Sequence, residues 1–375
     1  MRCPRQFHIL LPLAVLVAAA QPAQSQTFKS SAGPLKVVTV ARGLSHPWAL
    51  AFLPNGKMLV TERAGRLLVV TRNGGIGAPV RGLPRVAASG QGGLLDIAVD
   101  PGFATNRTIF FSYAEPGEGG AGTAVARAQL SGNSLRNVTV IFRMTPKSSG
   151  GRHFGSRIVI ARDGTLFVTL GERGQRSKAQ DTSINRGQVI RINKDGSIPK
   201  SNPFVGRAGF RPEIWSYGHR NPQGAALNPA TGRLWITEHG ARGGDEVNIP
   251  GAGRNYGWPV IAYGRHYWGG KIGEGKRKAG MEQPVHYWDP SIAPSGMAFV
   301  TGSIFKAWRG DVLVGALKFR MLVRLRFRNG RMVKEERLLR GIDERIRDVR
   351  VGPRGYIWLL TDSGNGKILR IEPGR

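Results

Sequence analysis

Cysteine is almost missing from this 375-residue sequence, in which Cys3 is the single thiol. One thiol cannot build an intramolecular disulfide framework, and it cannot supply a cysteine-rich zinc or iron–sulfur site. Disulfide-stapled domains and metal centres of that kind are therefore excluded.

Acidic residues are also scarce, because 24 Asp and Glu stand against 55 Lys and Arg, giving a formal net charge of +31. Such an excess usually indicates a polyanionic partner, for example nucleic acid, anionic lipid or acidic polysaccharide. The charge carries no information about the fold. Hydrophobic residues make up 41% of the chain, which is enough for a sizeable core and argues against global disorder.

Long apolar runs are limited to one, the segment FHILLPLAVLVAAA at residues 7–20, which follows Arg2 and Arg5. A basic start, a short apolar run and small residues ending at Ala20 are typical of a cleaved secretory signal. The run is too short to span a bilayer comfortably, which argues against a membrane anchor. We therefore predict a signal peptide and short leader over residues 1–26, with cleavage near residue 20.

Removal of this signal would place the mature protein in the periplasm or outside the cell. It would also remove Cys3 and two arginines, which lowers the net charge from +31 to +29. A chain without thiols suits an oxidising compartment. This location argues against nucleic acid as a partner, and it leaves peripheral association with an anionic cell envelope as one interpretation of the charge.

Six segments of the chain share one pattern, in which a small apolar strand, a turn and a second apolar strand follow one another. They begin at Trp48, Gly93, Ser156, Gln223, Ser295 and Ile346. Val, Ile, Leu, Phe and Thr dominate the strands, and turns such as Asn-Gly and Asp-Gly join them. No long helical period appears between the segments. Repeated units of this size, each about one four-stranded sheet, are typical of propeller blades.

We therefore predict an all-β protein, a six-bladed β-propeller formed as one domain by residues 27–375. Residues 37–40 could complete the sheet of the last blade and close the ring, which removes free sheet edges. A β-sandwich or two β domains is the alternative, and it explains the repeated unit less well. Two longer inserts, 174–212 and 250–294, are expected to be loops on one face, where sites on rigid scaffolds usually lie.

His153 precedes the third unit, and Glu172 ends the next strand 19 residues later. A strand–turn–strand hairpin could bring the two side chains together. A carboxylate on one imidazole nitrogen fixes the tautomer and raises the basicity of the other nitrogen. The pair is therefore a candidate general base, and the alternative is a structural histidine.

Polar and cationic residues recur at equivalent ends of the predicted blades. They are Gln91, Arg220, Asn221, Lys318, Arg345 and Arg347. Cations from distant segments that converge on one face could bind a polycarboxylate ligand. The alternative is that each is an ordinary solvated charge on a basic surface.

The segment EHGARGGDEVN at residues 238–248 is rich in glycine and acidic residues. Backbone carbonyls beside a carboxylate suit a hard cation such as Ca²⁺, whereas the alternative is an ordinary glycine-rich turn. The sequence contains no phosphate-binding loop, no HExxH, no GxSxG and no EF-hand pattern.

Several motifs occur together and in order from about residue 35 to the C-terminus. They are GQGGLLDIAVDP (90–101), LGERG (170–174), GSIPKSNPF (196–204), GHRNPQG (218–224), EHG…GDEVN…NYGWP (238–259), WDPSIAPSGM (288–297), LK (317–318) and RIRDV…LTD (345–362). This ordered set resembles the soluble PQQ-dependent aldose sugar dehydrogenases, which are relatives of soluble quinoprotein glucose dehydrogenase.

The resemblance implies a six-bladed propeller that holds pyrroloquinoline quinone (PQQ) and Ca²⁺ on one face and oxidises aldose sugars at C1 to lactones. It implies that His153 takes the proton of the C1 hydroxyl while a hydride passes from C1 to C5 of PQQ. Glu172 matches the carboxylate that orients His153. Arg220 and Asn221 match residues beside the quinone oxygens.

The remaining site residues also come from the resemblance. Gln91, Lys318, Arg345 and Arg347 match PQQ-binding positions. The carbonyls of Gly240 and Ala241 match ligands of a PQQ-bound Ca²⁺, and Glu246 with the carbonyl of Tyr256 matches a second, structural Ca²⁺ site. We further expect an unidentified electron acceptor and a monomer or homodimer.

Some positions depart from the glucose dehydrogenase pattern. Arg152 stands where those enzymes have an acid, Phe154 stands where they have a polar residue, and the 260–294 insert is short, so glucose preference does not follow. Two other functions stay open. One is a basic propeller that binds acidic polysaccharide without redox chemistry, and the other is a metal-dependent propeller hydrolase such as a lactonase.

Overall fold

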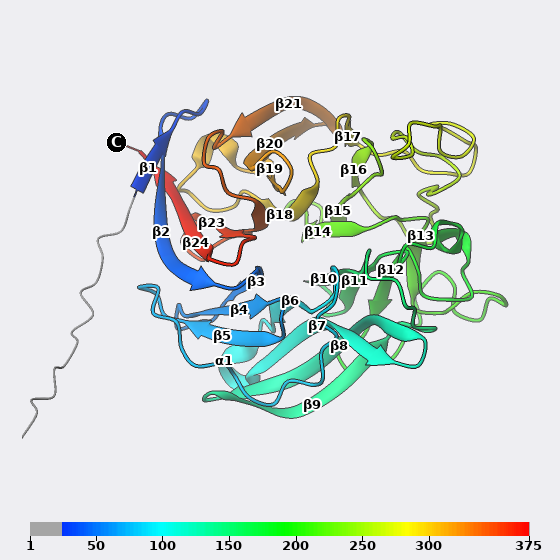
Figure 1. Cartoon of the computed structure of the whole chain (residues 1–375), viewed down its shortest axis with the longest axis horizontal. Helices are drawn as coiled ribbons and strands as arrows, with labels where there is room; N and C mark the ends of the chain where they lie inside the picture. The colour runs from blue at the N-terminus through cyan, green and yellow to red at the C-terminus, as the bar shows by residue number, and fades with distance from the viewer. Residues whose placement is uncertain (1–24, 375) are drawn as a thin grey trace, which may run out of the picture.

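The computed structural model describes residues 25–374 as a closed ring of six β-sheets around a central axis (Figure 1). The prediction of an all-β six-bladed propeller is confirmed. The predicted signal peptide, with its cleavage site near residue 20, lies outside the described residues. Within residues 25–374, no helix is long and apolar enough to cross a membrane.

The six blades follow one another along the chain. The first blade consists of β3 (Pro47–Phe52), β4 (Met58–Glu62) and β5 (Arg66–Val70). The second consists of β6 (Leu94–Val99), β7 (Thr108–Gly117), β8 (Gly120–Ser131) and β9 (Ser134–Arg143). The third consists of β10 (Gly155–Ile160), β11 (Leu166–Leu170), β12 (Gln188–Ile192) and β13 (Ile214–Tyr217). The fourth consists of β14 (Pro222–Leu227), β15 (Leu234–Glu238), β16 (Asp245–Asn248) and β17 (His286–Trp288).

The fifth blade consists of β18 (Pro294–Phe299), β19 (Val312–Ala316), β20 (Met321–Arg328) and β21 (Arg331–Leu338). The sixth consists of β22 (Ile346–Val351), β23 (Ile357–Thr361), β24 (Gly366–Pro373), β2 (Leu35–Leu44) and β1 (Ser25–Phe28). In the part of the chain that the structure describes, three short helices lie between strands: α1 (Phe103–Asn106), η1 (Arg176–Gln180) and η2 (Lys306–Trp308).

The ring closes where an N-terminal strand joins the last blade. Strand β2 pairs antiparallel with β24, and Val37 lies opposite Ile371. The predicted closure by residues 37–40 is therefore confirmed. Strand β1 adds a further edge, in which Ser25 and Gln26 pair with β2, so these two residues belong to the sheet and not to the leader.

The second strand of most blades is buried along its whole length, as in β4, β11, β15, β19 and β23. These strands read as continuous apolar runs because each is covered on both faces by neighbouring blades. Threonines inside them add hydrogen bonds to the next blade. Thr61 Oγ1 donates to the Leu95 carbonyl (2.6 Å), and Thr237 Oγ1 donates to the Ser295 carbonyl (3.2 Å). Such bonds fix the angular position of each inner strand, and thereby of the residues at its end.

The two long inserts differ from the expectation of pure loops. Residues 174–212 contain helix η1 and the third strand of blade three, β12, which pairs with β11 over five residues. Residues 250–294 are mostly loop and contain the short strand β17. The insert that contains β12 was misread because its five-residue strand is too short to stand out from its polar flanks.

Candidate active site

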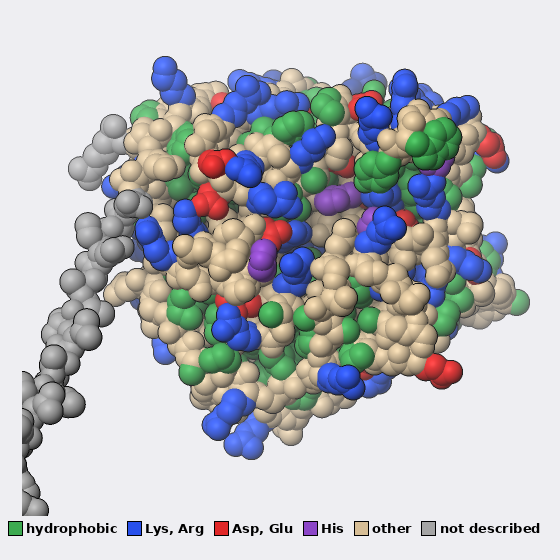
Figure 2. Space-filling model, viewed as in Figure 1, with side chains coloured by type: hydrophobic (Ala, Val, Ile, Leu, Met, Phe, Trp, Pro, Cys, Tyr) green, Lys and Arg blue, Asp and Glu red, His purple; other side chains and the backbone are tan. Residues whose placement is uncertain are grey.

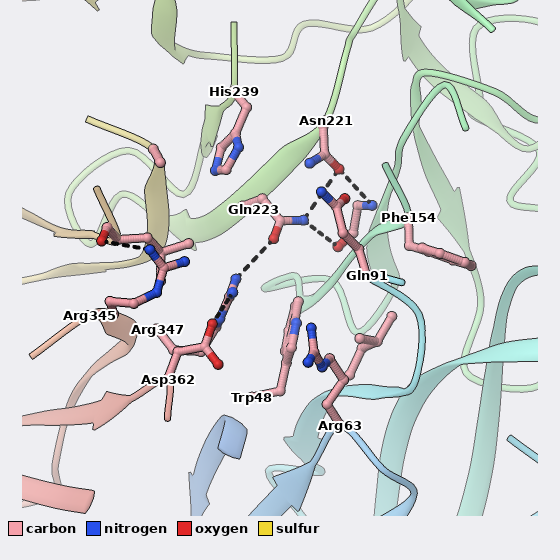
Figure 3. A pocket seen from close by; sticks show the side chains of 14 residues that line it. Trp48, Arg63, Gln91, Phe154, Asn221, Gln223, His239, Arg345, Arg347 and Asp362 are labelled. Atoms are coloured by element: carbon pink, nitrogen blue, oxygen red, sulfur yellow. Dashed lines mark hydrogen bonds and ion pairs between the residues drawn. The ribbon is translucent and has the colours of Figure 1, made fainter. Parts of the chain in front are cut away.

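A cavity of about 220 Å³ lies on the propeller axis, at the end where the first strand of each blade begins (Figure 3). Four of the predicted ligand-binding residues line it. They are Gln91, Asn221, Arg345 and Arg347. These four come from three different blades or their loops, so the structure brings together segments that lie up to about two thirds of the chain apart.

The second residue of several first strands also lines this cavity: Trp48 in β3, Leu95 in β6, Gln223 in β14 and Arg347 in β22. Sequence reasoning assigned no role to Trp48 and Gln223, nor to Arg63, His239 and Asp362, which line the cavity as well. The repeat contains a signal that could have identified these residues, because equivalent positions of the repeated units face the propeller axis.

His153 is not itself a lining residue of the cavity, but Phe154, which follows it, and Gln91, which binds its backbone, are. His153 contacts Glu172 as predicted. The Nδ1 atom of His153 lies 2.7 Å from Oε1 of Glu172, and both side chains are buried. The backbone N–H of His153 donates to the side-chain oxygen of Gln91 (2.8 Å). The Nε2 atom of His153 makes no hydrogen bond to any residue in the described part of the chain, so it is free to accept a proton.

The loop that carries His153 is held in a strained backbone conformation, with φ of 59° at His153. Arg173 stabilises it: this buried side chain donates hydrogen bonds to the carbonyls of Gly150 and Arg152 and lies over the ring of Phe154. Position 171 requires glycine, because a Cβ there would lie 2.0 Å from the His153 carbonyl oxygen. These contacts fix the position of the imidazole.

The pKa of the His153 imidazole lies below its ordinary value of 6.5. Burial is the largest cause, and the positive charge of Arg220 acts in the same direction, whereas the Glu172 carboxylate opposes the shift. His153 is therefore neutral near pH 7, which is the form that can act as a base.

A second histidine–glutamate pair, His219 and Glu238, has the same spacing of 19 residues in the next blade. Its Nδ1–Oε1 distance is 2.8 Å, but Nε2 of His219 contacts Ser216 Oγ at 2.9 Å and the ring stacks on Tyr256. Both ring nitrogens are occupied, so this pair is structural. The free Nε2 is what distinguishes His153.

Arg220 connects the two histidine–glutamate pairs. Its carbonyl accepts the N–H of Glu172 (3.0 Å), and its own N–H donates to Glu238 (2.8 Å). Arg220 is only 7% exposed, and its guanidinium lies over the Trp258 ring and donates to the His239 carbonyl (3.3 Å). Its Nε has no hydrogen-bond partner among the described residues, and a buried donor without a partner fits a site built for a ligand.

The predicted cations differ in their placement. Arg347 contacts Asp362 (2.7 Å) and Gln223 (3.3 Å) inside the cavity, as Figure 3 shows. Although burial acts the other way, Arg347 and His46 hold the pKa of Asp362 below its ordinary value. Arg345 donates to the Leu317 carbonyl at the rim. Lys318 is exposed and is not among the residues that line the cavity.

Beneath the cavity, two arginines and two aspartates form a buried ion network on the axis. Arg157 contacts Asp96 (3.2 Å) and Asp348 (2.9 Å), and Arg350 contacts the same two carboxylates at 2.7 and 2.8 Å. Asp96, Arg157 and Asp348 occupy the third position of their first strands. The network closes the floor, and Trp48 lies 4.1 Å from the Arg157 guanidinium.

The four predicted metal ligands, Gly240, Ala241, Glu246 and Tyr256, line one small cavity of about 20 Å³ next to Arg220. Glu246 is half-buried there, and desolvation, followed by the nearby carboxylate of Glu238, raises its pKa to about 8. No cluster of three or more His, Cys, Asp or Glu side chains suitable for a metal occurs within residues 25–374. A cation here would therefore depend on backbone carbonyls together with few carboxylates.

The family model described as glucose/sorbosone dehydrogenase matches residues 44–370 of this chain. The chain belongs to the glucose/sorbosone dehydrogenase family. The aldose sugar dehydrogenase YliI of Escherichia coli (strain K12) is 46% identical over 376 residues, which cover 98% of this chain and 99% of that protein. As a member of this family, the chain is an oxidoreductase.

Solved structures of other family members have the same fold. A crystal structure of a glucose dehydrogenase is 51% identical, covers 89% of this chain and 98% of its own, and has a TM-score of 0.88. The PQQ-bound aldose sugar dehydrogenase of Streptomyces coelicolor is 31% identical, covers 94% of this chain and 99% of its own, and has a TM-score of 0.76.

Proposed function

We propose that this glucose/sorbosone dehydrogenase oxidises aldose sugars at C1 to lactones, with PQQ as cofactor and His153 as general base. The observation that carries the proposal is the His153–Glu172 pair, because its Nε2 accepts no hydrogen bond within residues 25–374 and its neighbours Gln91 and Phe154 line the cavity that holds Arg345 and Arg347. The PQQ-bound structure of a relative supports the choice of cofactor.

The residues of the central cavity fit a flat ligand with several carboxylates. Arg345 and Arg347 provide guanidinium groups for carboxylates, and Gln91 and Asn221 provide amide groups. Arg220 lines the small neighbouring cavity and not the central one, and its unpartnered Nε would provide a buried donor for an oxygen that gains negative charge. When bound, PQQ supplies a two-electron acceptor for the hydrogen at C1. Lys318 stays a predicted contact that would need its side chain to turn inward.

The protein's own part in the reaction is proton transfer and positioning. His153 accepts the proton of the C1 hydroxyl at Nε2, and its imidazole becomes a cation. Glu172, 2.7 Å from Nδ1, stabilises that cation and keeps the ring in the tautomer with a free Nε2. Gln91 holds the His153 backbone, so the base and the ligand-binding residues keep a fixed relation.

We also propose a Ca²⁺ requirement. The carbonyls of Gly240 and Ala241 would hold a cation near the cofactor, and Glu246 with the Tyr256 carbonyl would hold a structural one. The buried side-chain oxygen of Asn248 has no hydrogen-bond partner among the described residues, and the Asn248 side chain contacts Glu246 (2.9 Å), so an oxygen ligand for a cation is available beside the proposed carboxylate.

Localisation in the periplasm or outside the cell, association with an anionic envelope, an external electron acceptor and a monomeric or homodimeric state belong to the same proposal. A hydrolase is disfavoured by the axial network, because its aspartates already pair with arginines.

The test is reconstitution of the purified apoprotein with PQQ and Ca²⁺, followed by dye reduction driven by a panel of aldoses. Activity with at least one aldose is expected, and the product should be the lactone. Failure with every aldose, although PQQ binds, would contradict the proposed substrate class.

A further inference from the structure

A second concave site lies at the far end of the blades from the candidate active site, between the first and sixth blades. It is a cavity of about 270 Å³ bounded by the turn after β3 and the turn after β22. Trp48 and Phe52 lie at opposite ends of β3, and the first lines the central cavity while the second lines this one. We call this separate site the 1–6 groove.

Arginine and aromatic side chains dominate the 1–6 groove. The arginines are Arg72, Arg354 and Arg370, and the aromatic residues are Phe52, Tyr356 and Trp358. Arg354 and Arg370 lie 5.6 and 5.4 Å from the centre of the Tyr356 ring. No Asp or Glu is among the described residues that line the groove.

The three arginines are neutralised only in part. Arg370 pairs with Glu372 through a 2.7 Å contact at the edge of the groove. The Nε of Arg72 donates to the Asn55 carbonyl, which carries no formal charge (2.8 Å). Arg354 is exposed and makes no ion pair to any residue of the described chain. Uncompensated positive charge therefore lies beside an aromatic surface.

The groove between the third and fourth blades offers a comparison within the same chain. It also holds arginines and aromatic residues, including Arg191, Arg233 and Trp215, in a volume of about 600 Å³. Asp163 lines this 3–4 groove and pairs with Arg191 at 2.7 Å. The carboxylate that neutralises the 3–4 groove has no counterpart in the lining of the 1–6 groove.

We propose that the 1–6 groove binds a carboxylate-bearing sugar unit of an acidic polysaccharide. A guanidinium group matches a carboxylate in shape and charge. The apolar face of a sugar ring can lie on Phe52 and Tyr356, which are half-buried in the groove lining, and a bare inorganic anion would leave them unused. The volume is near the lower end for ligand cavities, which suits one or two sugar rings.

A membrane surface fits the groove less well than a saccharide. Peripheral membrane binding uses protruding apolar side chains that enter the lipid. The exposed large hydrophobic side chains of the described chain, Trp268 and Val333 among them, lie outside the 1–6 groove. The groove is concave, and its aromatic rings are partly covered, as expected for a ligand that enters from solution.

The positive charge of the 1–6 groove differs from the positive charge dispersed over the rest of the surface. The face drawn in Figure 2 carries many more Lys and Arg than Asp and Glu side chains. Such dispersed charge attracts any polyanion weakly and without selectivity. The 1–6 groove adds a selective site, and its action does not depend on the proposed sugar oxidation.

Calorimetric titration of the full chain with a short oligogalacturonate tests the proposal, with a neutral malto-oligosaccharide of equal length as the ligand control. Arg354→Gln should weaken oligogalacturonate binding by about tenfold or more. Arg233→Gln, the matched loss of one charge in the 3–4 groove, should change it by less than about threefold. Arg354→Lys should fall between, because it keeps the charge and loses the planar fork.

Equal losses in Arg354→Gln and Arg233→Gln would overturn the proposal, because they would indicate dispersed charge alone. Equal binding of the neutral sugar, no binding of oligogalacturonate, or binding only to anionic phospholipid vesicles would overturn it as well. Unchanged thermal unfolding and unchanged aldose oxidation show that the variants are folded. If Arg354→Gln does not fold, Arg72→Gln replaces it, with the same expected loss.

Discussion

Replacement of Glu172 by Gln should lower kcat while the cavity stays intact. The carboxylate lies 2.7 Å from Nδ1 of His153, and both side chains are buried. In the transition state the imidazole gains a positive charge. The centre of this charge and the centre of the Glu172 carboxylate are about 4 Å apart. At an effective dielectric constant of about 20 their attraction is about 4 kcal/mol. Loss of that attraction would raise the activation barrier by this amount and lower the rate by about 10³-fold.

The assay is steady-state aldose oxidation by protein reconstituted with PQQ and Ca²⁺. We expect kcat of Glu172→Gln to fall by about 10²- to 10³-fold, with a smaller change in KM, because glutamine keeps the shape but not the charge. Glu172→Asp keeps the charge and should retain more activity than Glu172→Gln. A loss below about tenfold for Glu172→Gln, with PQQ bound normally, would refute the role of the carboxylate.

Further predictions concern the base His153, the ion network at the floor of the cavity and the buried donor Arg220. Because burial lowers the pKa of His153 below 6.5, kcat/KM should be level above about pH 6.5 and fall only at lower pH; a profile that first falls well above pH 7 would contradict this. The same shift makes protonation oppose folding, so the contribution of His153 to stability is present above pH 6.5 and is lost as pH falls toward the folded-state pKa. Asp96→Asn removes one of the two carboxylates that pair with Arg157 and Arg350, and it should lower the free energy of unfolding, measured by urea denaturation, by about 3–5 kcal/mol. A decrease below about 1 kcal/mol would show that the network is dispensable. Arg220→Ala should lower kcat by about 10²- to 10³-fold with partial recovery in Arg220→Lys; full activity of Arg220→Ala would rule out its role as a donor.

The blade repeat could be predicted because each unit repeats the same buried strand pair, and periodic burial leaves a periodic sequence. The closeness of His153 and Glu172 followed from the same hairpin. Gly155 at the start of β10 pairs with Leu170 at the end of β11, so residues just beyond these ends lie side by side. Local antiparallel geometry was therefore sufficient to predict this contact.

Contacts between distant blades could not be predicted in this way. Asp96 and Arg350 are 254 residues apart, and their ion pair depends on ring closure and on which residue of each inner strand faces the axis. The hydrogen bonds of Arg173 to the His153 loop depend on a strained backbone, which the spacing of residues in the sequence does not indicate. For the same reason the 1–6 groove could not be predicted, because two turns some 300 residues apart in the sequence form it together.

The measurement that tests the central claim most directly is single-turnover reduction of the reconstituted protein, followed by absorbance after an aldose is added. Wild-type protein should be reduced rapidly. His153→Ala should bind PQQ with similar affinity but be reduced at least about 10²-fold more slowly. Reduction of His153→Ala at nearly the wild-type rate would contradict the assignment of His153 as the base.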